Sequence, residues 1–449
     1  MSLDLPRPTG VDVALHEHPV ELLQRLLRFD TTNPPGGERA CIDWMEGVLR
    51  GAGLQTRVVA ADPERPNLVA RLRGDGVAAP LLLQGHVDVA STSGQRWTHA
   101  PFSGVVADGY VWGRGALDMK SGVAMMVAAV LRLVAGGRRP AGDIIVALLS
   151  DEEAGGDLGA RVVVDRHADL LEGVRYAIGE FGAFSMDIAG RRFYPIQVAE
   201  KQLCWMRATV RGPAGHGSLP MRGGAVARLA RLLRTLDRRR LPVHVTHVPR
   251  RMLEGIAAEL PAPAAPVIRG LLNPRLTDKL LRVLGEPGRA FDPLLHNTVN
   301  ATIVRAGEQV NVVPSEATVD LDGRLLPGFG PDALIAELRS LVGEHVELEV
   351  LRHEPAGPEE PDLMLFGLLS DVLRERDAHG TTVPMLLPGI TDARIFAKLG
   401  IQTYGFLPMQ LPRELRFLQL IHAADERLPS GAVEFGTNAI HAVLERYGR

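Results

Sequence analysis

Segments of strand length that are almost entirely apolar recur along the first part of this chain. They are Asn67–Arg73, Pro80–Val89, Asp143–Leu149 and Tyr176–Ile178, and a helix is expected over 121–135 between the second and the third. Strands that are apolar along their whole length are usually buried on both faces, whereas half-exposed strands alternate. The pattern therefore predicts an α/β fold, with a mixed central sheet that helices cover on both faces.

The pattern changes near residue 197, where strand-like segments begin to alternate between apolar and polar residues. A chain of 449 residues is also long for a single core. We predict a catalytic domain formed by 1–196 and 356–449, interrupted by an inserted α+β domain over 197–355. The Pro-, Arg- and Leu-rich stretch near 242–293 is expected to add helices to this insert.

Composition excludes several classes of function. The formal net charge is -3, so the chain lacks the basic excess typical of nucleic-acid binding. Its two cysteines, Cys41 and Cys204, lie too far apart in sequence for a CxxC motif, which favours a reducing compartment. No signal peptide and no membrane-spanning segment are evident. We expect a cytoplasmic protein.

Residues able to bind metals follow the apolar strands. His86 and Asp88 end one of them, Glu152 and Glu153 follow another, and Glu180 follows a third. In α/β sheets, binding sites form beyond the carboxyl ends of the strands. The sequence therefore predicts that these side chains lie at one edge of the sheet.

Each of these fragments also has an ordinary structural explanation. His86 and Asp88 could be a buried histidine paired with a carboxylate, and Asp118, before a helix, could be a cap. Acidic residues such as Glu152 and Glu153 are usually solvated, Glu180 alone is ambiguous, and a single late His422 is typical of a surface. These alternatives stay open for each fragment taken alone.

Together the same residues could provide the chemistry of amide hydrolysis. Two divalent cations bridged by a carboxylate can activate water and stabilise an oxyanion, and a nearby glutamate can act as the base. A histidine and carboxylate set suits Zn²⁺, and would also accept Co²⁺ or Mn²⁺. The chain lacks a GxSxG motif and a GxxxxGK[ST] motif, which disfavours a serine hydrolase and a P-loop enzyme.

Eight blocks, in order along the chain, resemble a family of co-catalytic dinuclear zinc metallopeptidases. The blocks are GHVDV, WTHAPFSG, VWGRGALDMKSG, SDEEAGG, GPAGHGSLP, NVVPSEAT, DGRLLPG and GITDARIFAKLG. The family includes aminoacylase, carboxypeptidase G, carboxypeptidase S, acetylornithine deacetylase and succinyl-diaminopimelate desuccinylase. The resemblance implies a zinc-hydrolase domain with an inserted ferredoxin-like lid domain, and the long insert is similar to the carboxypeptidase S branch.

The resemblance also implies a ligand set for two Zn²⁺ ions. His86 and Glu180 would bind one metal, Glu153 and His422 would bind the other, and Asp118 would bridge them.

Further roles follow from the same resemblance. Glu152 would be the general base and acid, and Asp88 would orient His86. His216 would stabilise the oxyanion from the lid, and Arg394 would bind a substrate carboxylate. Two lid residues, Asn311 and Arg324, would contact substrate less directly.

We therefore predict a metal-dependent hydrolase that cleaves an amide or peptide bond next to a free carboxylate. Its substrate would be a small acylated amino acid or a short peptide. The resemblance implies a homodimer through the lid domain, where this chain has extra helices that compact relatives lack. The alternatives are a non-catalytic binding homologue, which the complete ligand set disfavours, and an aminopeptidase of another dinuclear family, which Arg394 disfavours.

Overall fold

A computed structural model describes residues 13–449, which form two compact units. Unit 1 contains the described part of Met1–Val198 together with Asp362–Pro384 and Thr391–Arg449. Unit 2 contains Ala199–Pro361 and Met385–Ile390. Within the described range, no helix is both long and apolar enough to cross a membrane.

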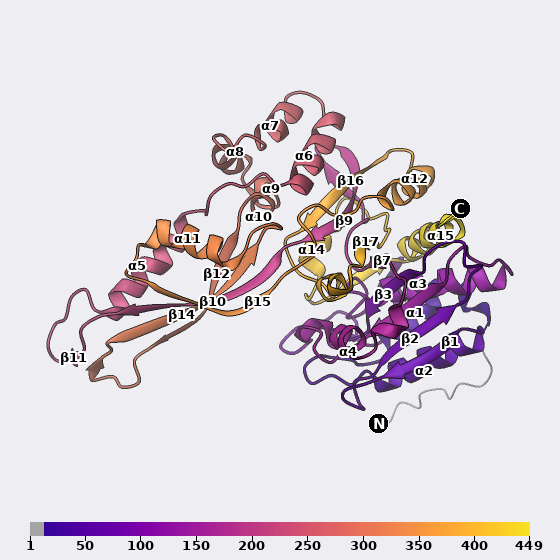
Figure 1. The fold of residues 1–449 in the computed structure, drawn as a ribbon, viewed down its shortest axis with the longest axis horizontal. Coiled ribbons are helices and arrows are strands. Elements are labelled where there is room, and N and C mark those ends of the chain that lie inside the picture. Colours follow the sequence, from indigo (N-terminus) through magenta and orange to yellow (C-terminus); the bar gives the residue numbers. More distant parts are fainter. Residues whose placement is uncertain (1–12) are drawn as a thin grey trace. The chain divides into compact units, whose positions relative to one another are not determined.

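Unit 1 is built on a nine-stranded mixed sheet, whose strands run β1-β2-β6-β3-β7-β17-β9-β16 with β8 paired to β9 (Figure 1). Their bounds are β1 (Gln55–Val59), β2 (Asn67–Leu72), β3 (Leu81–His86), β6 (Ile144–Leu149), β7 (Tyr176–Gly179), β8 (Met186–Ile188), β9 (Arg191–Glu200), β16 (Gly380–Leu387) and β17 (Gln402–Gly405). The central strands β6, β3, β7 and β17 are parallel to one another, whereas β1 pairs antiparallel with β2, β2 with β6, and β9 with β17. Every residue of β3 and β6 is buried, so the predicted mixed sheet is confirmed.

Helices cover both faces of this sheet. Leu82 packs in a core cluster with residues of α4 (Ala160–Arg166) and α13 (Ala393–Phe396). Gly85, three residues further along β3, faces Met119 and Val123 at the start of α3 (Lys120–Ala135). Because alternate strand residues point to opposite faces, α3 covers the face away from α4. The predicted helix over 121–135 is thus confirmed.

Further helices complete unit 1. They are α1 (Pro19–Leu27), α2 (Arg39–Gly51), α12 (Phe366–Arg376), α14 (Phe417–Leu420) and α15 (Ser430–Arg446), with 3-10 turns η1 (Val13–His16), η2 (Glu152–Ala154), η3 (Ala168–Leu171) and η4 (Ala397–Leu399). Helices α1 and α15 pack against α3. A small separate sheet has the order β18-β5-β4, with β4 (Val106–Ala107), β5 (Tyr110–Trp112) and β18 (Arg427–Pro429).

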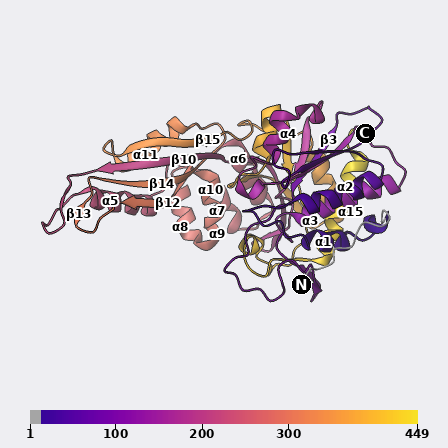
Figure 2. The same cartoon turned by 90° about the horizontal axis from the view of Figure 1, so that it is seen from below.

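Unit 2 contains a four-stranded antiparallel sheet with the order β12-β14-β10-β15 (Figure 2). Its strands are β10 (Gln202–Arg211), β12 (Thr298–Ala306), β14 (Glu316–Leu325) and β15 (Glu347–Glu354). One face packs on α5 (Ala225–Arg238) and α11 (Pro331–Val342) through a core that includes Met206, Val319 and Leu334. The other face is more exposed, which explains the alternating sequence of β10.

The expected additional helices are present in unit 2. They are α6 (His247–Glu259), α7 (Ala264–Gly270), α8 (Thr277–Leu284), α9 (Glu286–Arg289) and α10 (Asp292–Leu295), and β11 (Gly215–His216) pairs with β13 (Val312–Val313) as a separate ribbon. The predicted α+β character of the insert is confirmed.

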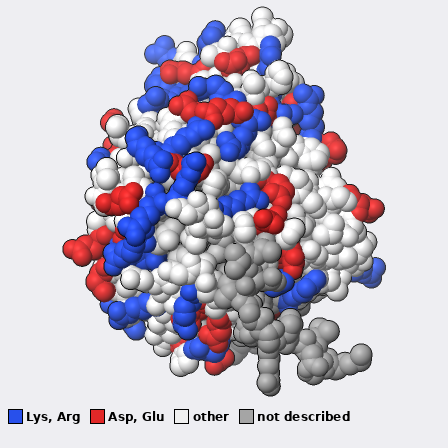
Figure 3. Space-filling view, turned by 90° about the vertical axis from the view of Figure 1, so that its right-hand side faces the viewer, with Lys and Arg blue, Asp and Glu red and all other residues white. Residues whose placement is uncertain are grey.

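Charged side chains of both signs are mixed on the face that Figure 3 shows, where acidic groups lie beside basic ones. This distribution agrees with the small formal net charge of -3.

Lys201, at the start of unit 2, is fully buried. Its Nζ donates hydrogen bonds to the carbonyl of His296 at 2.8 Å and to Oγ1 of Thr298 at 2.9 Å. Burial, with a smaller contribution from nearby Arg324, lowers the pKa of Lys201 from 10.5 to about 7. Protonation of Lys201 therefore lowers the free energy of unfolding of the folded unit, because burial removes more solvation from the ammonium than from the neutral amine.

We predict that this pKa shift makes stability rise with pH. Between pH 7 and 10.5 the unfolded chain binds more protons at Lys201 than the folded chain, so the free energy of unfolding increases with pH. Urea unfolding at pH 7 and pH 9.5 should show wild type gaining roughly 2–3 kcal/mol relative to Lys201→Met. Exposed Lys279 provides the control, because Lys279→Met should follow wild type. An equal difference between wild type and Lys201→Met at both pH values would contradict the prediction.

Candidate metal centre

The carboxylate of Asp118 lies between two imidazoles in unit 1. Its Oδ1 is 3.2 Å from Nε2 of His86, and its Oδ2 is 3.3 Å from Nε2 of His422. Each oxygen of one carboxylate thus faces a different histidine, as a carboxylate shared by two cations requires.

Two further carboxylates complete the arrangement. Oε2 of Glu180 lies 3.0 Å from Nε2 of His86, and Oε1 of Glu153 lies 3.0 Å from Nε2 of His422. The ligand atoms within each three-residue group lie within 4.8 Å of one another, and both groups contain Asp118. The structure brings together all the residues that the sequence predicted as ligands.

Strand ends explain how these distant residues meet. His86 is the last residue of β3, Glu153 lies in η2 just after β6, and Glu180 follows β7. Because β6, β3 and β7 are adjacent and parallel, their carboxyl ends share one edge of the sheet. Asp118 precedes α3, and His422 follows α14, so loops supply the remaining two ligands.

Asp88 contacts His86 mainly through its backbone. Nδ1 of His86 lies 3.0 Å from the Asp88 carbonyl oxygen and 3.4 Å from carboxylate Oδ1. Donation from Nδ1 to this carbonyl leaves the Nε2 lone pair directed toward the other ligands.

The carboxylate of Asp88 also holds the turn that carries two site glutamates. It accepts hydrogen bonds from the backbone N–H of Glu152 at 3.2 Å and of Glu153 at 3.1 Å, and from Nδ2 of Asn33 at 2.8 Å. The sequence did not indicate this role of Asn33, because the residue only precedes a Pro- and Gly-rich turn. Asp88 therefore orients both His86 and η2.

A buried ion-pair chain extends behind this turn. Arg65 contacts Asp151 at 2.9 Å and Glu38 at 2.6 Å, and all three residues are buried. Nothing in the sequence around Arg65 indicated this role, because its partners lie far away in the chain. The network fixes the residue that precedes Glu152.

Comparison with known proteins identifies the family of this chain. The sequence pattern of the peptidase family M20/M25/M40 matches residues 82–446. The chain belongs to this family. It is therefore a hydrolase of the M20 type, and the predicted family is confirmed.

Several M20 relatives are similar over most of the chain. Probable carboxypeptidase S-like 2 of Dictyostelium discoideum is 28% identical over 81% of this chain and 70% of its own length. Human N-fatty-acyl-amino acid synthase/hydrolase PM20D1 is 27% identical over 82% and 74%, and human aminoacylase-1 is 26% identical over 92% and 91%. The M20 metallo-carboxypeptidase Sso-CP2 from Sulfolobus solfataricus has the same fold, with a TM-score of 0.67, 17% identity and coverage of 96% of this chain and 99% of that one.

The donors of this M20 site fit a pair of divalent cations. Carboxylates outnumber imidazoles, so the cluster concentrates negative charge that cations would neutralise. Hydrogen bonds with Asp118 and Glu153 raise the pKa of His422 to about 10. For His86, burial alone would lower the pKa, but contacts with Asp118, Asp88 and Glu180 raise it well above its usual value. Metal binding has to displace these protons.

Glu152 lies beside the two ligand groups and belongs to neither of them. Burial, reinforced by the negative charge of Glu180, raises the pKa of its carboxyl well above the usual value. A glutamate with a raised pKa next to a metal pair suits a proton carrier rather than a ligand.

The predicted carboxylate clamp, Arg394, is buried beneath η2. Its guanidinium donates to the backbone carbonyl of Thr391 and, at 2.8 Å, to that of Gly155, which ends η2. Neighbouring Asp392 is also buried, and both of its carboxylate oxygens are without hydrogen-bond partners within residues 13–449. Burial raises the pKa of Asp392 to about 7.

The other three predicted site residues lie in unit 2. Nδ1 of His216 in β11 is 2.7 Å from Oγ of Ser218. The carbonyl of Asn311 accepts a hydrogen bond from the N–H of Gly217, and Arg324 in β14 forms an ion pair with Asp322 at 2.8 Å. His216 and Asn311 are thus neighbours on one ribbon, whereas Arg324 belongs to the sheet.

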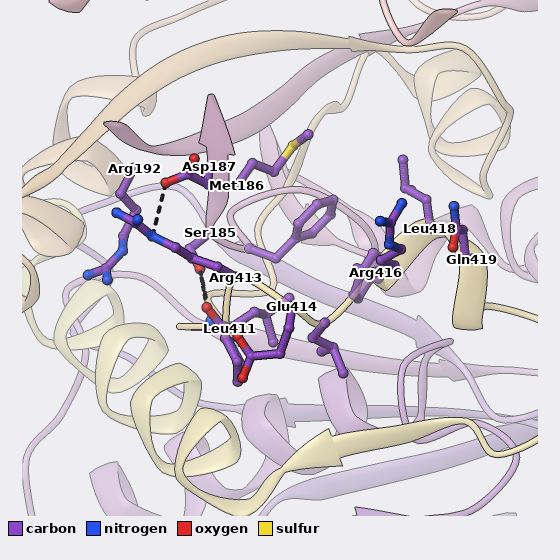
Figure 4. Close-up of a pocket in the computed structure, with 14 residues that line it drawn as sticks. Ser185, Met186, Asp187, Arg192, Leu411, Arg413, Glu414, Arg416, Leu418 and Gln419 are labelled. Atoms are coloured by element: carbon purple, nitrogen blue, oxygen red, sulfur yellow. Dashed lines mark hydrogen bonds and ion pairs between the residues drawn. The ribbon is translucent and has the colours of Figure 1, made fainter. Parts of the chain in front are cut away.

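A cavity of about 520 Å³ in unit 1 is lined by residues 184–187, which follow Glu180 along the chain, and by residues 411–419, which precede His422 (Figure 4). Phe184, four residues after Glu180, stacks on Phe417 of α14 with ring centroids 4.1 Å apart. Figure 4 shows Arg413 paired with Asp187 at one side and Arg416 at the other. An occupant of this cavity would contact residues 411–419, three residues short of His422.

We predict that Glu152→Gln retains metal and loses activity, because Glu152 is outside both ligand groups. Its kcat should fall by on the order of 10²–10⁴ while the metal content stays at the wild-type value. Atomic emission spectroscopy on the purified protein measures the content. Asp118→Asn is the matched control, since it changes the shared ligand and should lose metal as well as activity. Full activity of Glu152→Gln would disprove its role as the base.

Proposed function

We propose that this chain hydrolyses the amide bond of N-acyl amino acids, or of short peptides, that end in a free carboxylate. The observation that carries the proposal is the position of the Asp118 carboxylate between His86 and His422, with Glu152 nearby but outside both ligand groups. Aminoacylase-1 and the carboxypeptidase S-like protein, as relatives, support this substrate class.

Each residue has a distinct part in the proposed reaction. His86 and Glu180 would hold one Zn²⁺, Glu153 and His422 the other, and Asp118 both. When bound, the two cations lower the pKa of the attacking water and polarise the scissile carbonyl. Co²⁺ or Mn²⁺ would suit the same donors.

Glu152 would carry the proton between the two halves of the reaction. Its carboxylate takes the proton of the attacking water and later donates it to the leaving amine, which cannot depart as an anion. The raised pKa of Glu152 supports the second step, because burial and the negative charge of Glu180 favour the protonated carboxyl over the carboxylate. The hydrogen bond from the backbone N–H of Glu152 to the Asp88 carboxylate fixes the position of Glu152 during both steps.

Recognition of the substrate carboxylate would involve Arg394, whose planar guanidinium can bind a carboxylate through two hydrogen bonds. In this structure that guanidinium is engaged with the carbonyls of Thr391 and Gly155. Substrate binding would therefore replace or share these bonds. The roles of His216, Asn311 and Arg324 stay predictions from the sequence.

The carboxylate requirement has a direct kinetic test. N-acetyl-L-methionine should be hydrolysed with kcat/KM at least ~10–100-fold above that of N-acetyl-L-methioninamide, because a hydrogen-bonded charge contributes about 1.5–3 kcal/mol. Release of the free amine measures both reactions with Zn²⁺, Co²⁺ or Mn²⁺ supplied. Arg394→Met should lower kcat/KM more for the acid than for the amide. Equal rates for the two substrates in wild type would refute the carboxylate requirement and leave amide hydrolysis itself standing.

We also propose a homodimer formed through unit 2. Strand β12 is an edge of its sheet, and Ile303 and Val304 on it are 47% and 53% exposed. Exposed apolar residues on an edge strand favour pairing with a second chain. Light scattering during gel filtration should give about twice the 48.5 kDa of one chain, and Ile303→Lys should give the monomer mass. A wild-type mass of one chain at micromolar concentration would rule the dimer out.

A further inference from the structure

We propose that Arg114 and Glu426 are positioning residues, whose buried ion pair holds both the shared ligand Asp118 and the terminal ligand His422 in place for the cations. The inference rests on the proposed two-cation function, and it concerns residues to which neither the sequence motifs nor the ligand geometry assigned a role.

The pair is completely shielded from solvent. Nη1 of Arg114 lies 2.6 Å from Oε2 of Glu426, and neither side chain is exposed. Removing two charges from water is unfavourable, and their attraction has to offset this cost. A pair of this kind therefore adds little net stability, although removal of one partner leaves the other charge uncompensated.

Glu426 uses its second oxygen to hold the turn that carries Asp118. Oε1 accepts hydrogen bonds from the backbone N–H of Leu117 at 2.7 Å and of Asp118 at 3.2 Å. These donors lie just before α3, where the chain turns into the helix. The backbone of the shared ligand is thus fixed by a carboxylate more than 300 residues away.

Arg114 holds the loop that carries His422. Its Nη2 donates to the His422 carbonyl at 3.0 Å, and its Nη1 donates to the Ala423 carbonyl at 3.2 Å. Gln95 donates to the same His422 carbonyl at 2.8 Å and accepts from Arg114 at 2.9 Å.

The backbone of His422 requires such support. Its φ is 60°, a left-handed conformation that is unfavourable for a residue other than glycine. The two hydrogen bonds to its carbonyl offset this cost and direct the imidazole toward Glu153 and Asp118.

Strand pairing brings the two loops together. Arg427 of β18 pairs with Trp112 of β5, and the N–H of Gly113 donates to the Glu426 carbonyl at 3.0 Å. The Arg114–Glu426 ion pair then joins the loop that follows β5, which carries Asp118, to the loop that precedes β18, which carries His422. Its loss should consequently disturb Asp118 and His422, and should leave the strand-borne ligands His86 and Glu180 in place.

The experiment measures retention of zinc rather than activity alone. Zinc-loaded wild type, Glu426→Gln and Gln95→Met are dialysed against graded chelator concentrations, and retained zinc per chain is determined by atomic emission. We expect Glu426→Gln to weaken binding of the more easily removed zinc by ~10–100-fold, as changes to the residues supporting metal ligands do. Gln95→Met should weaken it less, since the Arg114 bonds to the loop remain.

Asp143→Asn is the matched control, because it removes an ion pair from the same unit at the amino end of β6. Asp143 accepts from Arg71 at 2.8 Å and from Arg73 at 2.9 Å, and lies at the opposite end of the strand from η2. Its melting temperature should fall while its zinc retention stays at the wild-type value.

The possible outcomes separate this inference from the proposed function. If Glu426→Gln and Gln95→Met both retain as much zinc as wild type, the positioning role is overturned. It is also overturned if Asp143→Asn loses as much zinc as Glu426→Gln, because that result would indicate general destabilisation. If Glu426→Gln does not fold, unchanged retention in Gln95→Met overturns the inference by itself. A wild-type chain that never holds two ions would instead overturn the two-cation function.

Discussion

The clustering of negative charge around Asp118 is the constraint on which the rest of unit 1 depends. One carboxylate faces two imidazoles, and Glu153 and Glu180 lie against the same imidazoles within 3.0 Å. Such a cluster repels itself unless protons or cations neutralise it. The raised pKa of His422, at about 10, shows that the protein's own groups already favour positive charge at this position.

Buried cations behind the cluster contribute to the same balance. Arg65 forms ion pairs with Glu38 and Asp151 and offsets one of their two negative charges, and Arg114 pairs with Glu426. Lys120 is fully buried too, and its Nζ donates to the Phe29 carbonyl at 2.7 Å. Each of these side chains also anchors a loop, so the electrostatic compensation and the positioning of the ligands are achieved by the same contacts.

Most of the fold could be predicted because local patterns and burial agree. The apolar segment Pro80–Val89 indicated a covered sheet, and the alternating segments after residue 197 indicated a half-exposed one; β3 and β10 confirm both. The contributions of Asn33, Arg65 and Glu426 could not be predicted in this way. Their partners are separated from them by tens to hundreds of residues, and an isolated polar residue next to a proline or in a loop has no periodicity to reveal it.

The sequence by itself determined which chemical groups are present. Because five of them follow three apolar strands, it also predicted that these five meet at one sheet edge. Only the tertiary structure decided that Asp118 directs one oxygen to each histidine, that the backbone of Asp88 contacts His86 more closely than its carboxylate, and that Arg394 is buried beneath η2. The physical reason is that local patterns specify which face of an element is buried. The direction of a loop side chain depends on hydrogen bonds and ion pairs that form after distant segments have packed together.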